Sequence, residues 1–301
     1  MTEKAILHTH THTHTPLFCS HADKILIDSR NSIYQCKDCG LYMAENFSFR
    51  SPSNPSAEEA MMDSIETLRR GNYREILTRI RRLLGDGKIC GLDVGCARGW
   101  FIDEAAKLGI SMDGIEPEEN FCLEAQGHGF NVINGLFPQD FNASRQYDFI
   151  IFNDVFEHLP DLDSVLRECA GLLKPEGLLI INCPDSSGIF FRLARTLMRF
   201  GIDSYWRRLW QTDFYSPHLW YFGKKNLTRL IEGYGFSLAD ISAPKTITVK
   251  GLRKRIMCGA GNVISQFATY LAVLAASPFL NLLPKDIMCL YFRKIKKEEK
   301  L

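Results

Sequence analysis

Small residues follow an apolar segment near position 94 and have the residue types of a ligand-binding turn. The run GLDVGCARGWF at positions 91–101 contains two glycines four positions apart, Gly95 and Gly99. Glycine lets the main chain pass close to a ligand where a side chain would collide. A helical pattern begins near Gly99, and a helix N-terminus offers unpaired N–H groups and the positive end of its dipole. The run therefore predicts a turn that holds a nucleotide-like ligand.

Two acids beside this turn narrow the choice of ligand. The spacing G-x-x-x-G differs from the G-x-G-x-x-G of dinucleotide folds, and Asp93 would repel a pyrophosphate but attract an ammonium group. Glu116 ends the next apolar run, about twenty residues beyond the turn, where an acid can hydrogen-bond both hydroxyls of a ribose. The alternative for Glu116 is a carboxylate at a helix N-terminus, since Pro117 begins a helical pattern. Asp93 and Glu116 together favour a nucleoside that carries an amino acid.

These residues need a sheet that brings the ends of several strands to one edge. Apolar runs typical of buried strands alternate with helical patterns at 100–108, 118–127 and 162–173. Such repeated units predict an α/β fold with a doubly wound, mostly parallel sheet, whose carboxyl edge binds ligands. The expected parallel strands span 88–94, 112–115, 130–133, 148–153 and 178–183.

Four runs in this order resemble the successive motifs of class I S-adenosylmethionine-dependent methyltransferases. More narrowly, they resemble the bacterial branch that contains ubiquinone-type O-methyltransferases and sugar methyltransferases. The runs are LDVGCARGWF, IEPEE, YDFIIFNDVFEHLPD and LLKPEGLLIINCP, and the later SPHLWYF and GYGF are similar as well. The resemblance covers roughly residues 85–245. It implies a Rossmann-like sheet of seven strands, in which a last strand at 286–293 inserts antiparallel.

The resemblance also implies which residues bind S-adenosylmethionine. Glu116 would bind its ribose, while Asn153 and Asp154 would line the methyl-transfer side. Asn134 and Gly135 follow the third strand, where many members place an acid near the adenine, so Asn134 departs from the family pattern. The residues implied around the methionine end are Asp93, Gly95, Cys96, Ala97 and Gly99.

His158, His218 and Asp154 are the candidate catalytic residues. A sulfonium methyl is already activated, so alignment of the reacting groups is the main task, and a hydroxyl acceptor also gains from a general base. His158 follows the fourth strand at the ligand-binding edge, and His218 lies in an aromatic-rich segment at 205–222 that could be a lid or core. The alternative for both histidines is packing without proton transfer. No carboxylate cluster for magnesium is evident in the sequence, which disfavours a catechol-type metal mechanism.

The resemblance implies methyl transfer to a small molecule, a sugar or glycan precursor, or a lipid-linked acceptor. Oxygen is the expected methylated atom, with nitrogen and carbon as alternatives. An inactive methyltransferase-like scaffold is a second reading, which predicts cofactor binding without turnover. A nicotinamide-dependent oxidoreductase is a third, and the glycine spacing argues against it.

Cysteine spacing near the N-terminus predicts a divergent zinc ribbon. Cys36-x-x-Cys39 followed by Gly-Leu is typical of a turn whose two thiolates hold a tetrahedral zinc ion. Cys19 supplies a third ligand, and His21 or His14 the fourth. Related methyltransferases often carry such a ribbon, which supports a structural role. Redox chemistry is the alternative, although no thioredoxin-like context surrounds the pair.

Composition places the chain in a reducing compartment. The 301 residues include ten cysteines, most of them isolated in apolar runs, and the first residues lack the pattern of a signal peptide. We therefore expect a cytoplasmic protein. The formal net charge of +1 gives no broad basic field, so long nucleic acid is not an expected partner.

The expected organisation has six parts. The segment at 251–284 is apolar enough to dock on the inner face of a membrane or to form a homodimer, but a single crossing would misplace the last strand. The parts are a disordered His/Thr tail at 1–15, the ribbon unit at 16–50, a linker and helices broken at Gly71 over 51–84, the methyltransferase core at 85–250, the apolar helical insertion at 251–284, and the last strand with a basic tail at 285–301.

Overall fold

Two β-sheets organise the chain, which we describe from a computed structural model. The larger sheet has seven strands in the order β10-β11-β8-β7-β4-β5-β6, and the smaller has four in the order β1-β2-β3-β9. The expected disordered tail at 1–15 lies outside the described residues. Those residues are 19–45, 55–142, 145–212, 216–246, 252–257, 263–276 and 283–296.

The larger sheet confirms the mostly parallel seven-stranded fold. Its parallel strands pair in register from β6 to β8, and β11 lies antiparallel between β8 and β10. The fifth expected strand is longer than 178–183, because Leu173 also pairs with Tyr147 of β7, across an irregularity that precedes Leu178. The strands are β4 (Cys90–Val94), β5 (Ser111–Glu116), β6 (Asn131–Asn134), β7 (Tyr147–Asn153), β8 (Leu173–Pro184), β10 (Phe236–Ser242) and β11 (Ile287–Lys294).

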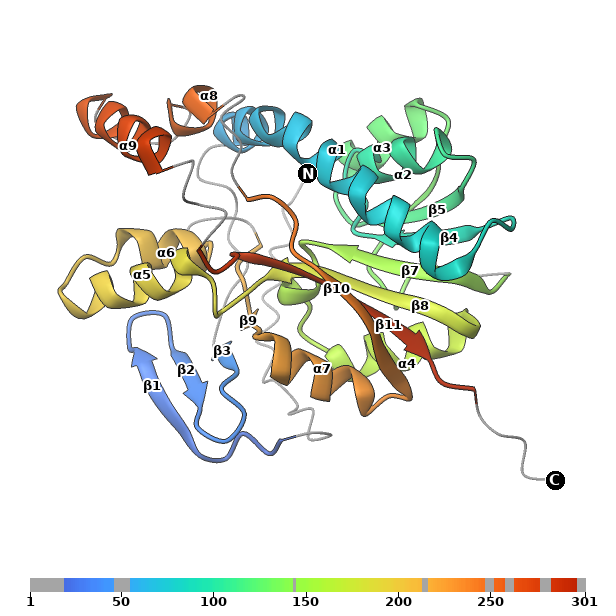
Figure 1. The fold of residues 1–301 in the computed structure, drawn as a ribbon, viewed down its shortest axis with the longest axis horizontal. Coiled ribbons are helices and arrows are strands. Elements are labelled where there is room, and N and C mark those ends of the chain that lie inside the picture. The colour runs from blue at the N-terminus through green and yellow to red at the C-terminus, as the bar shows by residue number, and fades with distance from the viewer. Residues whose placement is uncertain are drawn as a thin grey trace, which may run out of the picture.

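Helices cover both faces of this sheet, as Figure 1 shows. α1 (Pro55–Leu84), α2 (Trp100–Ala106) and α3 (Glu119–Gly127) pack on one face, while α4 (Leu162–Leu172) and α7 (Lys224–Glu232) pack on the other. α1 is one continuous helix, although Gly71 favoured a break. A Cβ at Gly71 would meet nothing within 4 Å, so this glycine serves no close contact. The buried face of α1 holds the helix together through Gly71.

The smaller sheet joins the N-terminal unit to the core. β1 (Lys24–Asp28), β2 (Ile33–Cys36) and β3 (Tyr42–Ala44) form an antiparallel meander, and β9 (Trp220–Tyr221) adds to its edge. Two further helices, α5 (Ile189–Arg199) and α6 (Ser204–Leu209), pack against it through a buried aromatic cluster (Figure 1). The cluster includes Tyr42, Phe191, Trp206, Trp210 and Tyr221. Most of the aromatic segment is therefore core.

The apolar segment near the C-terminus contains two short helices, α8 (Leu252–Met257) and α9 (Val263–Ala276), which lie beyond one end of α1 in Figure 1. Within the described residues, no helix is both long and apolar enough to span a membrane. Val263, Phe267 and Leu271 are 65%, 52% and 48% exposed. Their spacing of four residues places these apolar side chains on one face of α9.

A buried carboxylate ties three strands of the sheet together. Asp113 of β5 accepts hydrogen bonds from Arg145 Nη2 at 2.6 Å, from the Tyr147 hydroxyl at 2.7 Å and from Asn131 Nδ2 at 2.8 Å. Burial raises the pKa of Asp113, but these hydrogen bonds outweigh it and hold the pKa below its usual value. Both oxygens of the buried Asp113 carboxylate thus accept hydrogen bonds.

Replacing Asp113 by alanine should destabilise the protein by about 1–3 kcal/mol, because the buried Tyr147 hydroxyl would lose its acceptor. Urea denaturation measures the change. Glu75→Ala is the matched control, since its ion pair with Lys245 is 58% and 62% exposed and should contribute less than about 1 kcal/mol. Equal losses in the two variants would contradict this role for Asp113.

Candidate functional site

The glycine turn connects β4 to α2 at the carboxyl edge of the larger sheet. Gly95 and Gly99 have φ values of 69° and 75°, in the left-handed region that favours glycine. A Cβ on Gly95 would lie 2.5 Å from Cγ2 of Val155, so this turn packs directly against the residues after β7. Cys96 is buried, and its Sγ lies 3.9 Å from the carbonyl oxygen of Ala97 in the same turn.

Glu116 links the turn after β4 to the turn after β5. One carboxylate oxygen accepts a hydrogen bond from the N–H of Ala97 at 2.8 Å, and the other accepts one from Glu118 at 3.0 Å. Burial raises the pKa of Glu116, while the two backbone hydrogen bonds oppose this rise. Each oxygen has one of its acceptor positions filled, which leaves acceptor capacity for a ligand hydroxyl.

Asp93 is a buried acid with a single weak partner. It is 2% exposed, and its Oδ1 lies 3.4 Å from Nδ2 of Asn153, which is oriented in turn by Asn182. Burial raises the pKa of Asp93 to about 8, against the effect of the Asn153 hydrogen bond and with a further rise from the charge of Glu116. A buried carboxylate is costly unless a cation pairs with it, so this position suits an ammonium group.

The turn after β6 is closed by its own side chains. Asn134 Nδ2 donates to the carbonyl oxygens of Glu116 and Pro117, at 3.0 and 3.2 Å. Asp140, which no sequence motif singled out, accepts a hydrogen bond from the N–H of Leu136 at 2.8 Å and lies against Gly135. Position 134 is an asparagine and not an acid, but Asp140, six positions later, lies against the same turn.

Helix α1 contributes two residues that the motifs did not reveal. Arg69 Nη2 donates to Oδ2 of Asp154 at 3.0 Å, and the backbone of Asp154 has a φ of 55°. Burial raises the pKa of Tyr73 to about 12; the Arg69 charge opposes this rise, whereas the charges of Asp154 and Asp93 add to it. Arg69 and Tyr73 therefore lie between the glycine turn and the end of β7.

A carboxylate and two histidines meet just beyond β7. The 3₁₀ helix at Phe156–His158 carries Glu157 and His158, and His218 reaches them from the segment before β9. His218 Nε2 lies 3.9 Å from Oε1 of Glu157, and the two imidazole rings are 4.7 Å apart. Burial lowers the pKa of both histidines and raises that of Glu157. The sequence singled out the histidines but not Glu157.

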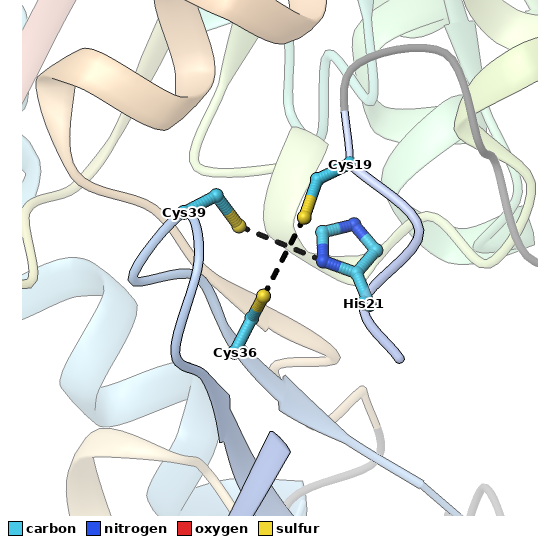
Figure 2. A group of neighbouring side chains, drawn as sticks. All are labelled: Cys19, His21, Cys36 and Cys39. Carbon is cyan, nitrogen blue, oxygen red and sulfur yellow. Dashed lines mark hydrogen bonds between the residues drawn. The ribbon is translucent and has the colours of Figure 1, made fainter. Parts of the chain in front are cut away.

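Four zinc-type ligands converge at the base of the smaller sheet (Figure 2). The Sγ atoms of Cys19 and Cys36 are 3.5 Å apart, and Cys39 Sγ is 3.5 Å from Nδ1 of His21. A tetrahedral zinc ion with Zn–S distances of about 2.3 Å requires thiolate sulfurs about 3.8 Å apart. The four side chains therefore fit one metal ion. The alternative ligand His14 lies outside the described residues.

Comparison with known proteins agrees with this geometry. A family model described as a methyltransferase domain matches residues 67–241. The chain is 25% identical over 151 residues to a ubiquinone biosynthesis O-methyltransferase of Bradyrhizobium diazoefficiens, covering 47% of this chain and 60% of that relative. The chain thus spans less than two thirds of the length of this relative.

Solved structures show the same fold at low identity. The plantazolicin methyltransferase in complex with SAH superimposes with a TM-score of 0.51, at 12% identity, covering 81% of this chain and 92% of that one. The magnesium protoporphyrin IX methyltransferase of Synechocystis with bound SAH gives 0.51 at 11% identity, covering 82% and 90%. The family model covers more than half of the chain, and the glycine turn and strand order agree with it: the chain belongs to the class I S-adenosylmethionine-dependent methyltransferases.

Proposed function

We propose that this chain transfers a methyl group from S-adenosylmethionine to a hydroxyl oxygen of a small-molecule, sugar or glycan-precursor, or lipid-linked acceptor. The observation that carries the proposal is Asp93, a buried carboxyl beside a glycine turn with no cationic partner in the described residues. The O-methyltransferase name of the Bradyrhizobium relative supports oxygen as the methylated atom. Acceptor selection belongs to the segments after β7 and before β9.

Binding of the cofactor rests on residues of three neighbouring strands. Asp93 would pair with its ammonium group, and Glu116 would accept hydrogen bonds from its ribose hydroxyls. Gly95, Cys96, Ala97 and Gly99 would supply backbone groups, while Asn134 and Gly135 would border the adenine. S-adenosylmethionine supplies a methyl on a positively charged sulfur, so the protein needs only to align the acceptor and exclude water. Asn153 orients Asp93 through the hydrogen bond at 3.4 Å.

The acceptor side would use Asp154, His158 and His218. His158 Nδ1 lies 3.0 Å from the carbonyl oxygen of Pro217, to which it must donate, so Nε2 of the neutral ring keeps its lone pair. Burial favours the neutral ring by lowering its pKa. A neutral imidazole at this edge can act on the proton of an acceptor hydroxyl. Asp154, paired with Arg69, would form the border of the acceptor site on the side of α1.

We also propose a zinc ion at Cys19, His21, Cys36 and Cys39, within an N-terminal unit at 16–50. Three thiols and one imidazole form a closed structural set with no open position. The remaining division is a linker with α1 at 51–84, the core at 85–250, the insertion at 251–284 and the last strand at 285–301. The ion would hold the unit that contributes β3 to the edge of β9.

The exposed apolar face of α9 suggests contact with a membrane surface. Val263, Phe267 and Leu271 point away from the core, and Arg253 of the neighbouring helix is exposed as well. Apolar side chains next to basic ones suit the interface of an anionic bilayer. We propose that 251–284 docks the cytoplasmic protein on the inner face of a membrane, with a homodimer as the alternative occupant.

Asp93→Asn should weaken binding of S-adenosylhomocysteine by at least about thirtyfold, or about 2 kcal/mol, because the ligand ammonium loses its counter-charge. Isothermal titration calorimetry measures the affinity, and Asp86→Asn on the exposed loop before β4 serves as the control. Unchanged affinity in Asp93→Asn, with intact folding, would remove Asp93 from the cofactor site.

The same interaction should make binding depend on pH. Asp93 must be ionised to pair with the ammonium group, and its pKa is raised to about 8 in the free protein. Below pH 8 each binding event must expel a proton, so affinity should fall about tenfold per pH unit between pH 8 and pH 6. Titrations across this range test the effect. A flat profile for the unaltered protein would contradict it, whereas Asp93→Asn should be flat.

Cys36→Ser should abolish the zinc content of the protein purified under reducing conditions. The unaltered chain should hold one zinc at the Cys19 cluster, measured by inductively coupled plasma mass spectrometry together with thiol release by a mercurial reagent. Cys90→Ser, a half-buried cysteine of β4 outside the cluster, is the matched control. An unchanged amount of thiol-bound zinc in Cys36→Ser would exclude this ligand set.

Replacing both Phe267 and Leu271 by serine should lower binding to vesicles that contain phosphatidylglycerol by at least about tenfold, since each exposed side chain loses about 1.5 kcal/mol or more of burial. Vesicle sedimentation measures the bound fraction. Leu123→Ser on α3 is the control, because Leu123 is exposed to a similar degree, at 57%. Equal binding of all three proteins would exclude membrane docking through α9, and a concentration-dependent dimer lost in the double variant would favour the second copy.

A further inference from the structure

A pocket lies on the flank of α1, between this helix and the segment at 242–244 that follows β10. Its volume of about 450 Å³ is in the range of pockets that hold small organic molecules, about 300–1,000 Å³. Four of its lining residues are spaced three or four positions apart on one face of α1: Asn72, Glu75, Arg79 and Arg82. None of these four belongs to the proposed cofactor or acceptor side. We call this hollow the α1 pocket.

Arginine side chains give the α1 pocket its charge. Among the described residues that line it, Arg74, Arg79 and Arg82 are basic, and Glu75 is acidic. Glu75 already pairs with Lys245, at 2.8 Å between Nζ and Oε1. The lining therefore carries a surplus of positive charge, which attracts an anionic ligand.

The acids near these arginines compensate only part of their charge. Arg79 Nη1 and Arg82 Nη2 donate to the same oxygen of Asp240, Oδ2, at 2.8 and 2.6 Å. Burial raises the pKa of Asp240, but hydrogen bonds from Arg79 and from a backbone N–H, together with both arginine charges, hold it below its usual value. Arg74 pairs with Glu104 at 3.1 Å, an acid that two further basic residues share. Positive charge thus remains for a ligand.

The unused side of Arg79 has the geometry of an anion site. A guanidinium has five N–H donors, and Nε and Nη2 form one side that matches two oxygens of a phosphate or carboxylate. Within the described residues, Arg79 hydrogen-bonds only through Nη1, to Asp240 and to the carbonyl oxygen of Ile241 at 3.4 Å. In the same part of the chain, Arg82 uses only Nη2. Both arginines therefore keep donors for a ligand.

Hydrogen bonds hold the walls of the α1 pocket in place. Asn72 Nδ2 donates to the carbonyl oxygen of Lys245 at 2.9 Å, and the N–H of Lys245 donates to Asn72 Oδ1 at 3.1 Å. Ser242 Oγ lies 3.2 Å from the hydroxyl of the buried Tyr291. These contacts fix the segment after β10 to α1 on one side and to β11 on the other. A preformed pocket loses less conformational freedom when a ligand binds.

We propose that the α1 pocket binds a phosphate monoester, with its phosphate group at Arg79 and Arg82. Such a group carries a charge of about −1.5 to −2 at neutral pH, so it compensates more of the arginine charge than a single carboxylate does. The organic part would lie against the apolar lining residues Ile76, Ala243 and Pro244. Water-soluble metabolites and the headgroup of phosphatidic acid present this same chemical group, and the experiment below separates these two sources.

Isothermal titration calorimetry of the full-length chain with glucose 6-phosphate tests the pocket. The unaltered protein should bind this probe, whereas glucose, which lacks the phosphate, should give no heat of binding. Arg79→Gln should weaken binding by at least about tenfold, because it removes charge-assisted hydrogen bonds. Arg79→Lys should restore only part of the affinity, since an ammonium group keeps the charge but lacks the paired donors.

A second variant fills the pocket without removing a charge. Ala243 is exposed, so Ala243→Trp should fold normally, and its side chain should weaken binding of the probe by at least about tenfold. Arg208→Gln is the matched control, because it removes the charge of an exposed arginine on α6 and should leave the affinity unchanged. Dihexanoyl phosphatidic acid, titrated below its micelle concentration, identifies the source: tighter binding than glucose 6-phosphate assigns the site to a lipid headgroup, and weaker binding to a metabolite.

Circular dichroism and urea denaturation of each variant report folding. Arg82→Gln replaces Arg79→Gln if the latter does not fold, since the Arg82 side chain is 65% exposed. The proposal is overturned if the unaltered protein binds neither phosphate probe at millimolar concentration, or if the folded pocket variants keep full affinity. Displacement of glucose 6-phosphate by S-adenosylhomocysteine would also overturn it, because the phosphate would then lie in the proposed cofactor site.

Discussion

Burial of the Asp93 carboxyl is the constraint on which the site depends. The group sits at the end of a central strand, 2% exposed, because β5 and β7 pair with β4 on both sides and α1 covers the edge. In this setting its charge is costly, and its pKa rises to about 8. A ligand with an ammonium group would remove that cost, which is the physical basis of the cofactor-binding role that we propose for Asp93.

The neighbouring groups follow from this arrangement. Glu116 lies one strand away and uses both oxygens to hold the backbone of the turns after β4 and β5. Arg69 balances Asp154 at the end of β7, while Tyr73 lies between the two acidic positions. Beyond Asp154 the character changes, since Glu157 and two histidines bring neutral or unpartnered groups together. The proposed cofactor and acceptor sides thus differ in how their charges are compensated.

Sequence patterns revealed the parts of this structure that are local in the chain. The apolar strands, the glycine turn and the two acids at strand ends lie within one run of about ninety residues, and periodicity locates each of them. The Cys36-x-x-Cys39 spacing likewise led to the cluster in Figure 2. The two shorter helices that Gly71 made possible form one helix, because buried contacts on one face of α1 outweigh a single residue of low helix propensity.

Residues that act through distant packing escaped prediction. Arg69 and Tyr73 precede the first motif by about twenty positions, and only the placement of α1 on the sheet brings them to the site. Glu157 resembles an ordinary surface glutamate in the sequence, because acids are seldom buried. Asp140 returns to its turn through a loop that no periodicity describes. Their roles depend on tertiary contacts, which residue spacing does not encode.

The pairing of β3 with β9 has a consequence for the order in which the molecule is made. Residues 42–44 leave the ribosome nearly 180 positions before their partners at 220–221, with Tyr42 opposite Tyr221 and Met43 opposite Trp220. The N-terminal meander must therefore wait, with one edge unpaired, until most of the chain has been synthesised. A metal ion bound early at its base would keep that edge in shape during the wait, so metal supply during translation would influence the yield of folded protein.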